Sequence, residues 1–250
     1  MPTLEELAPG SAPPALAARA SELEAAHGDL GALAIMRLAI RKLFPERITL
    51  VSSFGAESAV LLHMAATIDR DLPVTFVDTG RLFPETLAYR DELVDLLGLT
   101  DVRTVGPDAA EMERLDPYGA MFAIDADECC RLRKVEPLAR AIAPFEAWIT
   151  GRKRYQAATR TAMPVFEADA THIKVTPLAA WGMEEVRAYL KAHDLPVHPL
   201  VGRGYPSIGC APCTTPVAAG EDPRAGRWRG SAKIECGIHV SKAGVERRSA

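Results

Sequence analysis

The fold is decided by Ile48-Thr49-Leu50-Val51-Ser52-Ser53-Phe54-Gly55-Ala56-Glu57-Ser58, in which a short strand-like run passes directly into small polar residues. Helix-forming residues continue from about Glu57 to Ile68, and a second apolar run follows at Val74 to Val77. Another helical stretch extends from about Pro84 to Leu97. Alternation of strand, helix and strand predicts a parallel sheet with helices on its faces. The expected fold class is therefore α/β.

The pattern extends outward from this stretch in both directions. On the N-terminal side, an Ala-, Leu- and Glu-rich segment up to about Phe44 predicts one or two helices. Beyond Pro196, Pro, Gly, Arg and Cys replace the apolar periodicity, which predicts an irregular, mobile tail. We divide the chain into a helical segment at 1–47, an α/β domain at 48–200 and a cysteine-containing segment at 201–250. Further strands are expected at Val102 to Val105, Trp148 to Thr150 and His172 to Val175, and further helices near Glu128 to Ile142 and Met183 to His193.

Charge and composition limit the class of protein. The 250 residues are 48% hydrophobic and carry a formal net charge of −4. This charge gives no general attraction to nucleic acid or anionic lipid, so an anionic ligand has to be small and held by local groups. No stretch approaches the roughly 18 apolar residues of a membrane span, and the N-terminus lacks a secretory signal pattern. We expect a soluble cytoplasmic protein that binds neither nucleic acid nor membranes.

Two loops at the carboxyl ends of the first two strands carry the polar groups of a candidate binding site. Ligands of open α/β sheets bind at this edge, where the loop Ser52 to Ser58 would turn backbone N–H groups and hydroxyls toward an anion. The second strand ends in Asp78-Thr79-Gly80, which adds a carboxylate and a hydroxyl. Serine and glycine also occur in such loops simply to turn the chain and cap a helix. The loop alone leaves both interpretations open.

The cysteines suggest metal chemistry. Cys129 and Cys130 adjoin, Cys210 and Cys213 form a C-x-x-C pair, and Cys236 stands alone. An odd number of cysteines without a secretory signal argues against a disulfide framework. Four thiolates can hold Zn²⁺ or a [4Fe-4S] cluster. Adjacent cysteines are awkward for a compact tetrahedral zinc site, so thiolate-only ligation favours the cluster, with zinc as the alternative.

The two loops together resemble those of the adenine nucleotide alpha-hydrolase (PP-loop) superfamily, whose pyrophosphatases usually carry Ser-Gly-Gly-x-Asp-Ser. The variant Ser-Phe-Gly-Ala-Glu-Ser resembles the sulfonucleotide reductases. Three further motifs resemble the assimilatory adenylyl-sulfate reductases that use thioredoxin, and the resemblance runs from about Ile48 to Val240. The motifs are Cys129-Cys130-x-x-x-Lys134, Gly209-Cys210-Ala211-Pro212-Cys213-Thr214 and Lys233-Ile234-Glu235-Cys236-Gly237-Ile238-His239.

The resemblance implies a role for each matching position. Cys236 would be the nucleophile, and Lys134 would lie between the cluster and the substrate sulfate. The stretch Gly151-Arg152-Lys153-Arg154-Tyr155-Gln156, with Thr159-Arg160, is similar to an arginine loop that usually reads Gly-x-Arg-Arg-x-Gln. Lys153 departs from that pattern and Arg154 keeps it. Cluster ligands would be Cys129, Cys130, Cys210 and Cys213, and nucleotide-binding positions would be Ser52, Ser53, Phe54, Gly55, Ser58, Asp78, Thr79, Gly80, Arg154, Arg160 and Arg227.

Physical chemistry supports the role of Cys236. A lone cysteine is more often a small buried hydrophobe, but this one lies in a polar segment between Lys233 and His239, whose positive charge would lower its pKa. The basic run from Arg152 to Arg160 follows a strand end, where it is placed to hold phosphate or sulfate rather than only to solvate the surface. His198 and His239 have no partner that the sequence identifies, and neither is assigned as a catalyst.

The resemblance implies a reaction in assimilatory sulfate reduction. The sulfo group of adenosine 5′-phosphosulfate would pass to Cys236 with release of AMP, and thioredoxin or a similar dithiol donor would then liberate sulfite. One alternative is the same chemistry on 3′-phosphoadenosine 5′-phosphosulfate. Others are an ATP pyrophosphatase such as a tRNA-thiolating enzyme, and a zinc-stapled module without catalysis. A homo-oligomer is compatible with the sequence, which identifies no interface.

Overall fold

The centre of the molecule is a mostly parallel sheet. A computed structural model describes residues 12–156, 160–231, 233 and 235–238. Within them the strand order is β3-β2-β1-β4-β6-β5, and every pair is parallel except β5 with β6. The predicted α/β fold is therefore confirmed, and β5 is an edge strand that the sequence did not reveal. The strands are β1 Ile48–Ser52, β2 Val74–Val77, β3 Val102–Val105, β4 Ala147–Thr150, β5 Phe166–Ala168 and β6 Ile173–Val175.

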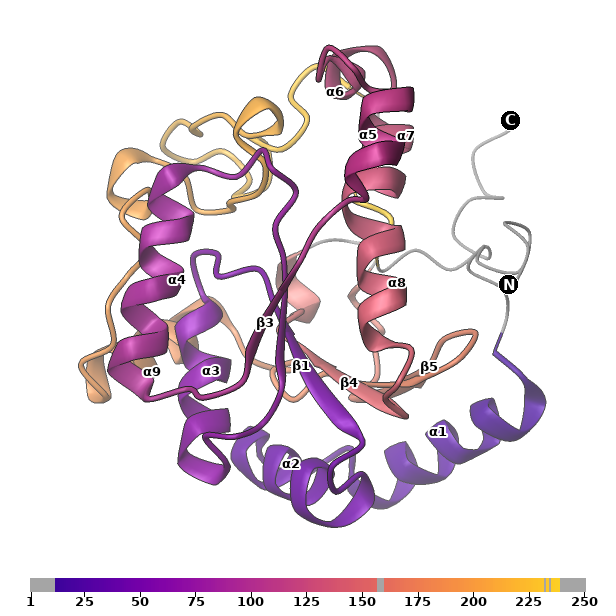
Figure 1. The fold of residues 1–250 in the computed structure, drawn as a ribbon. Helices are drawn as coiled ribbons and strands as arrows, with labels where there is room; N and C mark the ends of the chain where they lie inside the picture. Colours follow the sequence, from indigo (N-terminus) through magenta and orange to yellow (C-terminus); the bar gives the residue numbers. More distant parts are fainter. Residues whose placement is uncertain (1–11, 157–159, 232, 234, 239–250) are drawn as a thin grey trace.

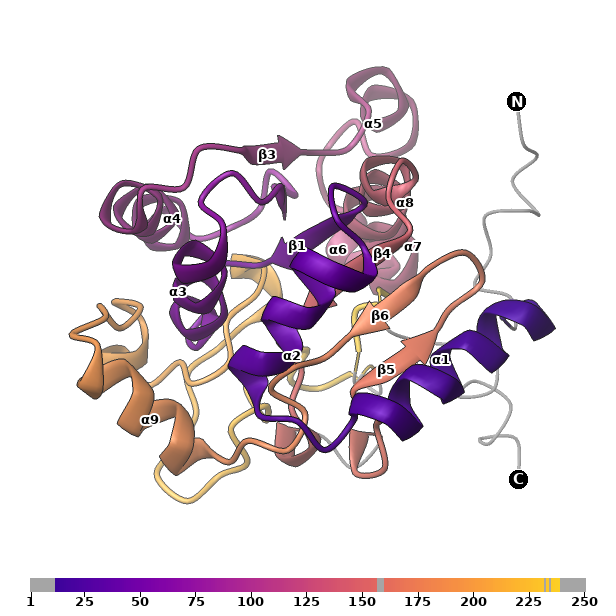
Figure 2. The same cartoon turned by 90° about the horizontal axis from the view of Figure 1, so that it is seen from below.

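Helices cover both faces of this sheet (Figures 1 and 2). One face carries α8, which packs against β2 and β3, and the other carries α3, α4 and α9, which contact one another through α3. Figure 2 shows α1 lying along β5 at the edge. The helices are α1 Pro14–His27, α2 Ala32–Leu38, α3 Ser58–Ile68, α4 Pro84–Leu97, α5 Ala109–Leu115, α6 Met121–Ile124, α7 Ala126–Cys130, α8 Glu136–Ile142 and α9 Met183–Ala192.

The helix predicted from Glu128 to Ile142 is divided in the structure. Its first part, α7, begins after Asp125, whose Oδ1 accepts hydrogen bonds from two backbone N–H groups of the first turn. A π-helical turn, Arg131–Val135, then separates α7 from α8. Such turns are rare and frequently occur at functional sites, because they change which way the following side chains face. Here the turn contains Lys134.

One hydrophobic core joins the sheet to the N-terminal helices. Ala20 of α1 and Ile35 of α2 are buried in the same cluster as Leu50 of β1 and Ile149 of β4. The described part of the segment 1–47 therefore packs onto the α/β domain, because central parallel strands need apolar cover on both faces. A second, smaller cluster consists of Leu138, Ile142 and Trp148, and Val51, Val77 and Ile238 pack against it.

The described residues after Pro196 form what we call the tail. Apart from two 3-10 turns, Val201–Arg203 and Ala211–Cys213, it is irregular, as predicted. The tail (orange to yellow in Figure 1) is nevertheless packed against the domain, since a β-bridge joins its Cys210 to Leu82, which lies just before α4. Residues Thr159, Ile234 and His239 of the predicted motifs lie outside the described residues. None of the helices in the described ranges is both long and apolar enough to cross a bilayer.

Candidate active site

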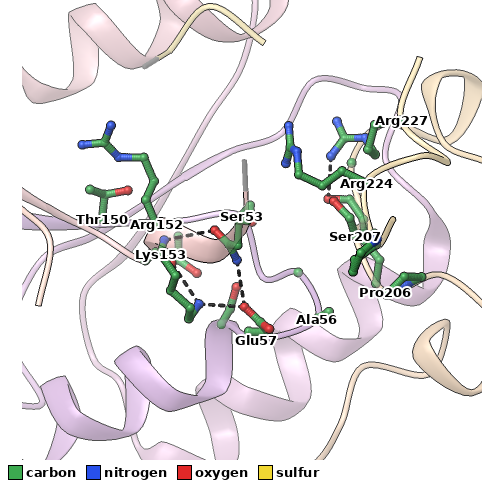
Figure 3. A pocket seen from close by; sticks show the side chains of 18 of the residues that line it. Ser53, Ala56, Glu57, Thr150, Arg152, Lys153, Pro206, Ser207, Arg224 and Arg227 are labelled. Atoms are coloured by element: carbon green, nitrogen blue, oxygen red, sulfur yellow. Dashed lines mark hydrogen bonds and ion pairs between the residues drawn. The ribbon is translucent and has the colours of Figure 1, made fainter. Parts of the chain in front are cut away.

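A cavity of about 720 Å³ opens where the parallel strands end. Ser52 of β1, Val77 of β2 and Thr150 of β4 line it, together with residues of the tail. Parallel strands end at a common edge, so residues far apart in the sequence meet there. Figure 3 shows Arg152 and Lys153 on one side of the cavity, and Arg224 and Arg227 extending from the tail on the other. We call this cavity the main pocket.

The loop between β1 and α3 forms one wall of the main pocket. Ser53, Gly55 and Ser58 line it, as the sequence predicted for a binding loop. Phe54 instead turns into the core, where it is fully buried and meets Phe76 edge-on, with ring centroids 5.3 Å apart. Its φ of +47° is uncommon for a residue with a large side chain. The contribution of Phe54 is thus to fix the turn, while the small residues beside it face the cavity.

Glu57 ties this loop to the segment that follows β4. Its Oε2 accepts hydrogen bonds from Lys153 Nζ at 2.7 Å and Gln156 Nε2 at 2.9 Å, and its Oε1 accepts one from the Tyr155 hydroxyl at 2.5 Å. Burial lowers the pKa of Lys153, and the Glu57 carboxylate opposes that shift. The lysine that departs from the family's arginine pattern is therefore engaged in holding two walls of the main pocket together.

The basic segment after β4 divides between the main pocket and the protein interior. Arg152 lines the pocket, is 7% exposed and pairs with Glu167, while its Nε has no hydrogen-bond partner among the described residues. A buried N–H donor without a partner is costly, and an anionic ligand would satisfy it. Arg154, which the sequence predicted to bind nucleotide, turns away and donates through Nε to the carbonyl of Met163 at 2.9 Å.

The tail supplies a second group of cations. Arg224 and Arg227 line the main pocket, and the Arg227 guanidinium stacks over Trp228 at 4.5 Å from the ring centroid. Burial lowers the pKa of Arg227, as does the nearby charge of Arg224. Arg227 Nε is buried and has no partner within the described part of the chain. A side chain at Gly209 would collide with this guanidinium, since its Cβ would lie 2.2 Å from Nη2.

Cys236 and Lys134 lie in the wall of the same main pocket. Lys134 also lines a second, smaller cavity, so it separates the two. Burial is the largest single influence and lowers the pKa of Lys134, but the negative charges of Cys210, Cys236 and Cys130 raise it, and the net shift is upward. The ammonium therefore stays charged, and it lines both the main pocket and the cavity of the paired cysteines.

The four paired cysteines surround the second cavity. Cys129 and Cys130 reach it from the end of α7, and Cys210 and Cys213 reach it from the tail. Burial raises the pKa of the Cys130 thiol to about 11, and it also raises those of Cys129 and Cys213. Cysteines bind metals as thiolates, so a metal bound by these residues would displace their protons. The chemistry of this donor set fits a thiolate-bound metal group.

The arrangement of the thiols bears on which metal group they fit. No three histidine, cysteine, aspartate or glutamate side chains in the described ranges converge as ligands of one ion would. A tetrahedral zinc ion would draw its thiolates to within about 4 Å of one another, because each Zn–S bond is about 2.3 Å long. Four thiols that line one cavity are a donor set that either a zinc ion or a [4Fe-4S] cluster can use.

The turn after β2 faces the cysteine cavity rather than the main pocket. Thr79 is fully buried, and its Oγ1 lies 3.2 Å from Cys210 Sγ. Asp78 Oδ1 accepts a hydrogen bond from Gly80 N at 2.8 Å, which stabilises the turn. Arg133 donates to the Thr79 carbonyl at 2.9 Å and so ties the turn to the π-helical turn. The three residues predicted to bind nucleotide thus support the cysteine site in this structure.

Sequence reasoning missed several groups that line the main pocket. Arg224 and Glu235 resemble ordinary solvated charges in the sequence, and Glu57 looked like a helix-starting residue. Their importance comes from contacts between segments about 75 to 100 residues apart, such as the pairing of Arg160 with Glu235. Only the adjacency of Glu235 to Cys236 was a visible signal.

Known proteins share this chain's sequence over most of its length. Residues 47–216 match the model of the phosphoadenosine phosphosulfate reductase domain. An adenosine 5′-phosphosulfate reductase of Mesorhizobium japonicum is 55% identical over 232 residues, which are 93% of this chain and 91% of the relative. The Chelativorans sp. protein of the same name is 53% identical over 88% of this chain and 91% of the relative. A phosphoadenosine 5′-phosphosulfate reductase of Gloeobacter violaceus is 44% identical, covering 85% and 90%.

Solved structures agree with this relationship. Phosphoadenylyl-sulfate reductase from Candida auris, in a phosphate complex, has a TM-score of 0.68 and 26% identity, covering 78% of this chain and 96% of that chain. FMN adenylyltransferase from Candida glabrata, with FAD and pyrophosphate, has a TM-score of 0.53 at 16% identity, covering 81% and 74%, and shares the fold. The family match, the relatives and the fold agree with the motifs that meet around the two cavities, and the chain belongs to the phosphoadenosine phosphosulfate reductase domain family.

Proposed function

We propose that the protein reduces adenosine 5′-phosphosulfate to sulfite and AMP in assimilatory sulfate reduction. The observation that carries the proposal is the presence of Cys236 and Lys134 in one pocket with the β1–α3 loop and buried arginines. The relatives with 55% and 53% identity are named adenosine 5′-phosphosulfate reductases. The free state of all five cysteines fits a reducing compartment, so we assign the activity to the cytoplasm.

The main pocket offers separate groups for the two ends of this substrate. The small residues Ser53, Gly55 and Ser58 let the nucleotide approach the backbone at the strand ends. Arg152 and Arg227 each hold a buried Nε donor that an anionic oxygen would satisfy. Charge-assisted hydrogen bonds to phosphate or sulfate are about twice as strong as neutral ones. The phosphosulfate would therefore lie between the β4 side and the tail, with the sulfate toward Lys134.

The first chemical step would be transfer of the sulfo group to Cys236. The thiolate sulfur attacks the sulfate sulfur, a new S–S bond forms, and the bond from that sulfur to the phosphate oxygen breaks. The electron pair of the broken bond leaves with AMP. The positive charge of Lys134 would stabilise negative charge that develops on the transferred oxygens. The product is an S-sulfocysteine, whose S–S bond holds the electron pair that sulfite takes away in the second step.

Reduction would occur in the second step with a dithiol protein such as thioredoxin. One thiolate of the donor attacks Cys236 Sγ, sulfite leaves with the electron pair of the S–S bond, and a mixed disulfide forms. The second donor thiol then resolves that disulfide, so the donor is oxidised to a disulfide and Cys236 returns as a thiol. The dithiol supplies both electrons.

We further propose that Cys129, Cys130, Cys210 and Cys213 hold a [4Fe-4S] cluster. The four cysteines line one cavity, and thiolate-only ligation by such a set, with two of the cysteines adjacent, supports this assignment. When bound, the cluster would add the electrostatic influence of its irons to the sulfate end of the main pocket. Anaerobically purified protein should show broad visible absorption and contain iron and acid-labile sulfide. A colourless protein that contains stoichiometric zinc would overturn the assignment.

The function is tested by comparing nucleotides and donors in a sulfite-release assay. Adenosine 5′-phosphosulfate with thioredoxin should give sulfite and AMP, and the 3′-phosphorylated nucleotide should react with a lower kcat/KM. Cys236→Ser should bind the nucleotide but release no sulfite, because the hydroxyl cannot form the S–S bond. Preference for the 3′-phosphorylated nucleotide would reassign the substrate, and pyrophosphate release from ATP would replace the proposal with the pyrophosphatase alternative.

A further inference from the structure

The carboxylate of Glu235, directly before Cys236, is held by two arginines. Its Oε1 accepts hydrogen bonds from Arg160 Nε at 3.0 Å and Nη2 at 2.6 Å. Its Oε2 accepts one from Arg224 Nη2 at 3.2 Å. The Glu235 side chain is 11% exposed and that of Arg160 is 9% exposed, so the pair is shielded from solvent. The contact joins the tail to the segment that follows β4.

A second anchor lies on the other side of the cysteine. Ile238 packs against the cluster formed by Leu138, Ile142 and Trp148. Gly237 has a φ of +88°, which favours glycine, and a Cβ there would lie 3.2 Å from Val135 Cγ2. The chain therefore turns sharply after Cys236, and Ile238 packs against residues of α8. Cys236 lies between an ionic anchor and an apolar one.

The charge of Glu235 is unexpected for this place. A carboxylate beside a thiolate nucleophile repels both that thiolate and an anionic substrate, and the repulsion is strong where water is excluded. Two arginines neutralise the carboxylate, which removes most of this cost. Such a residue is understandable if its ion pairs fix the position of the neighbouring cysteine.

We propose that Glu235 is a positioning residue for Cys236. Its ion pairs with Arg160 and Arg224 hold the tail so that Cys236 Sγ faces the main pocket in line with the bond to be broken. The inference rests on the proposed sulfo transfer and assigns to Arg160 a role in the tail rather than in direct substrate binding. Alignment of a nucleophile to near contact with the reacting atom contributes much of a rate enhancement.

The hydrogen bonds of Arg160 support a positioning role for Glu235. They argue against the alternative that the Glu235 carboxylate only fills the anion site of an empty pocket. Besides the two contacts to Glu235, Arg160 Nη1 donates to Gln156 Oε1 at 2.9 Å, so the guanidinium is held on both sides. The buried Nε donors of Arg152 and Arg227 are left for anionic oxygens of the substrate. The main pocket can thus bind an anion while Glu235 stays paired.

The decisive variant is Glu235→Gln, which keeps the shape and one acceptor but removes the charge. We expect single-turnover sulfo-enzyme formation to slow about tenfold or more, with the dissociation constant of the nucleotide within about twofold of the wild type. Glu235→Asp, which keeps the charge on a shorter side chain, should recover part of the rate. Alkylation of Cys236 by iodoacetamide, mapped by peptide mass, should become faster in Glu235→Gln because the tail is released.

Glu221→Gln is the matched control. Glu221 lies in the same tail and accepts hydrogen bonds from Arg229 at 3.1 and 2.9 Å, but Arg229 and Glu221 are exposed and away from the pocket. This variant should match the wild type in rate, nucleotide affinity and alkylation. Equal changes in both variants would reduce the effect of Glu235 to general loosening of the tail and overturn the proposal.

Two other results would also overturn it. Tighter nucleotide binding by Glu235→Gln at an unchanged rate would make Glu235 a competitor of the substrate rather than a positioning residue. Unchanged rate, affinity and alkylation would leave it without a role. The wild-type reaction with adenosine 5′-phosphosulfate, run in parallel, separates failure of the proposed function from failure of this inference, and the alkylation result does not depend on the substrate.

Discussion

At the scale of single residues, the site depends on charges that are buried beside the groups they serve. Lys134 lies between the cysteine cavity and the main pocket, and the nearby thiols hold its pKa above the usual value. Arg152 and Arg227 each bring a buried donor without a partner in the described chain. Groups with these properties bind anions well because they need little rearrangement when the ligand arrives.

Replacing Lys134 with methionine removes its charge while keeping much of its volume. We expect Lys134→Met to slow sulfo transfer about 100-fold, the typical effect of losing one donor that stabilises charge in a transition state. Lys191→Met is the control, because Lys191 is an exposed lysine on α9. Rapid-quench measurement of sulfo-enzyme formation gives the rates. A wild-type rate in Lys134→Met would contradict the role of this ammonium.

His198 is a structural residue rather than an acid or base of the site. Its Nδ1 accepts a hydrogen bond from Leu200 N at 3.2 Å, so Nε2 carries the proton and faces Thr86 Oγ1 at 3.0 Å. Burial lowers its pKa from 6.5 to about 4. The histidine that the sequence left without a partner thus joins α4 to the start of the tail as a neutral side chain.

This lowered pKa predicts a pH dependence of stability. Between about pH 6.5 and pH 4 the unfolded chain binds a proton that the folded state rejects, so stability falls as the pH drops through that window, by up to about 3 kcal/mol. His198→Asn should be less stable at neutral pH but should lose this part of the pH dependence. Urea unfolding at neutral and mildly acidic pH measures both. The same acid-induced loss in the variant would contradict the assignment.

At the scale of elements, the sequence predicted regular segments well and the short or irregular ones poorly. β2, β3 and α4 have the predicted bounds, because strong apolar patterns and Pro84 mark their ends. β5 has only three residues, too few for a periodic signal. The π-helical turn that carries Lys134 also has no local signature, and its Arg133 donates a hydrogen bond to the Thr79 carbonyl of the β2–α4 turn, which is distant in sequence.

The conformation of the tail depends on glycines at positions where two segments of backbone approach closely. A Cβ at Gly226 would lie 2.0 Å from the Thr215 carbonyl oxygen, and that contact cannot be relieved without moving backbone. Gly226→Ala should displace the segment that carries Arg224 and Arg227 and weaken nucleotide binding about tenfold. Calorimetric titration with the nucleotide measures it. Gly202→Ala is the control, because its Cβ would meet nothing within 4 Å; equal affinity in both variants would contradict the expectation.

At the scale of the whole molecule, the functional site exists only where distant segments meet. The sequence indicated the site residues through motif resemblance, and the structure brings Ser53, Lys134, Arg227 and Cys236 to the same pocket. The sequence could not show that the side chains of Phe54 and Arg154 turn inward, because local sequence pattern does not fix the direction of a side chain in a loop. Nor could it foresee the pairing of Arg160 with Glu235, which depends on the tail folding back over the sheet edge.

The central claim is that Cys236 accepts the sulfo group, and intact-mass measurement tests it most directly. The protein is mixed with adenosine 5′-phosphosulfate without a reductant, and its mass and peptide map are recorded before and after thioredoxin is added. We predict a mass increase of one SO₃ group, located on the peptide that contains Cys236 and lost as sulfite when thioredoxin is added. Sulfite release without any covalent intermediate, or an SO₃ group carried by another cysteine, would contradict the account.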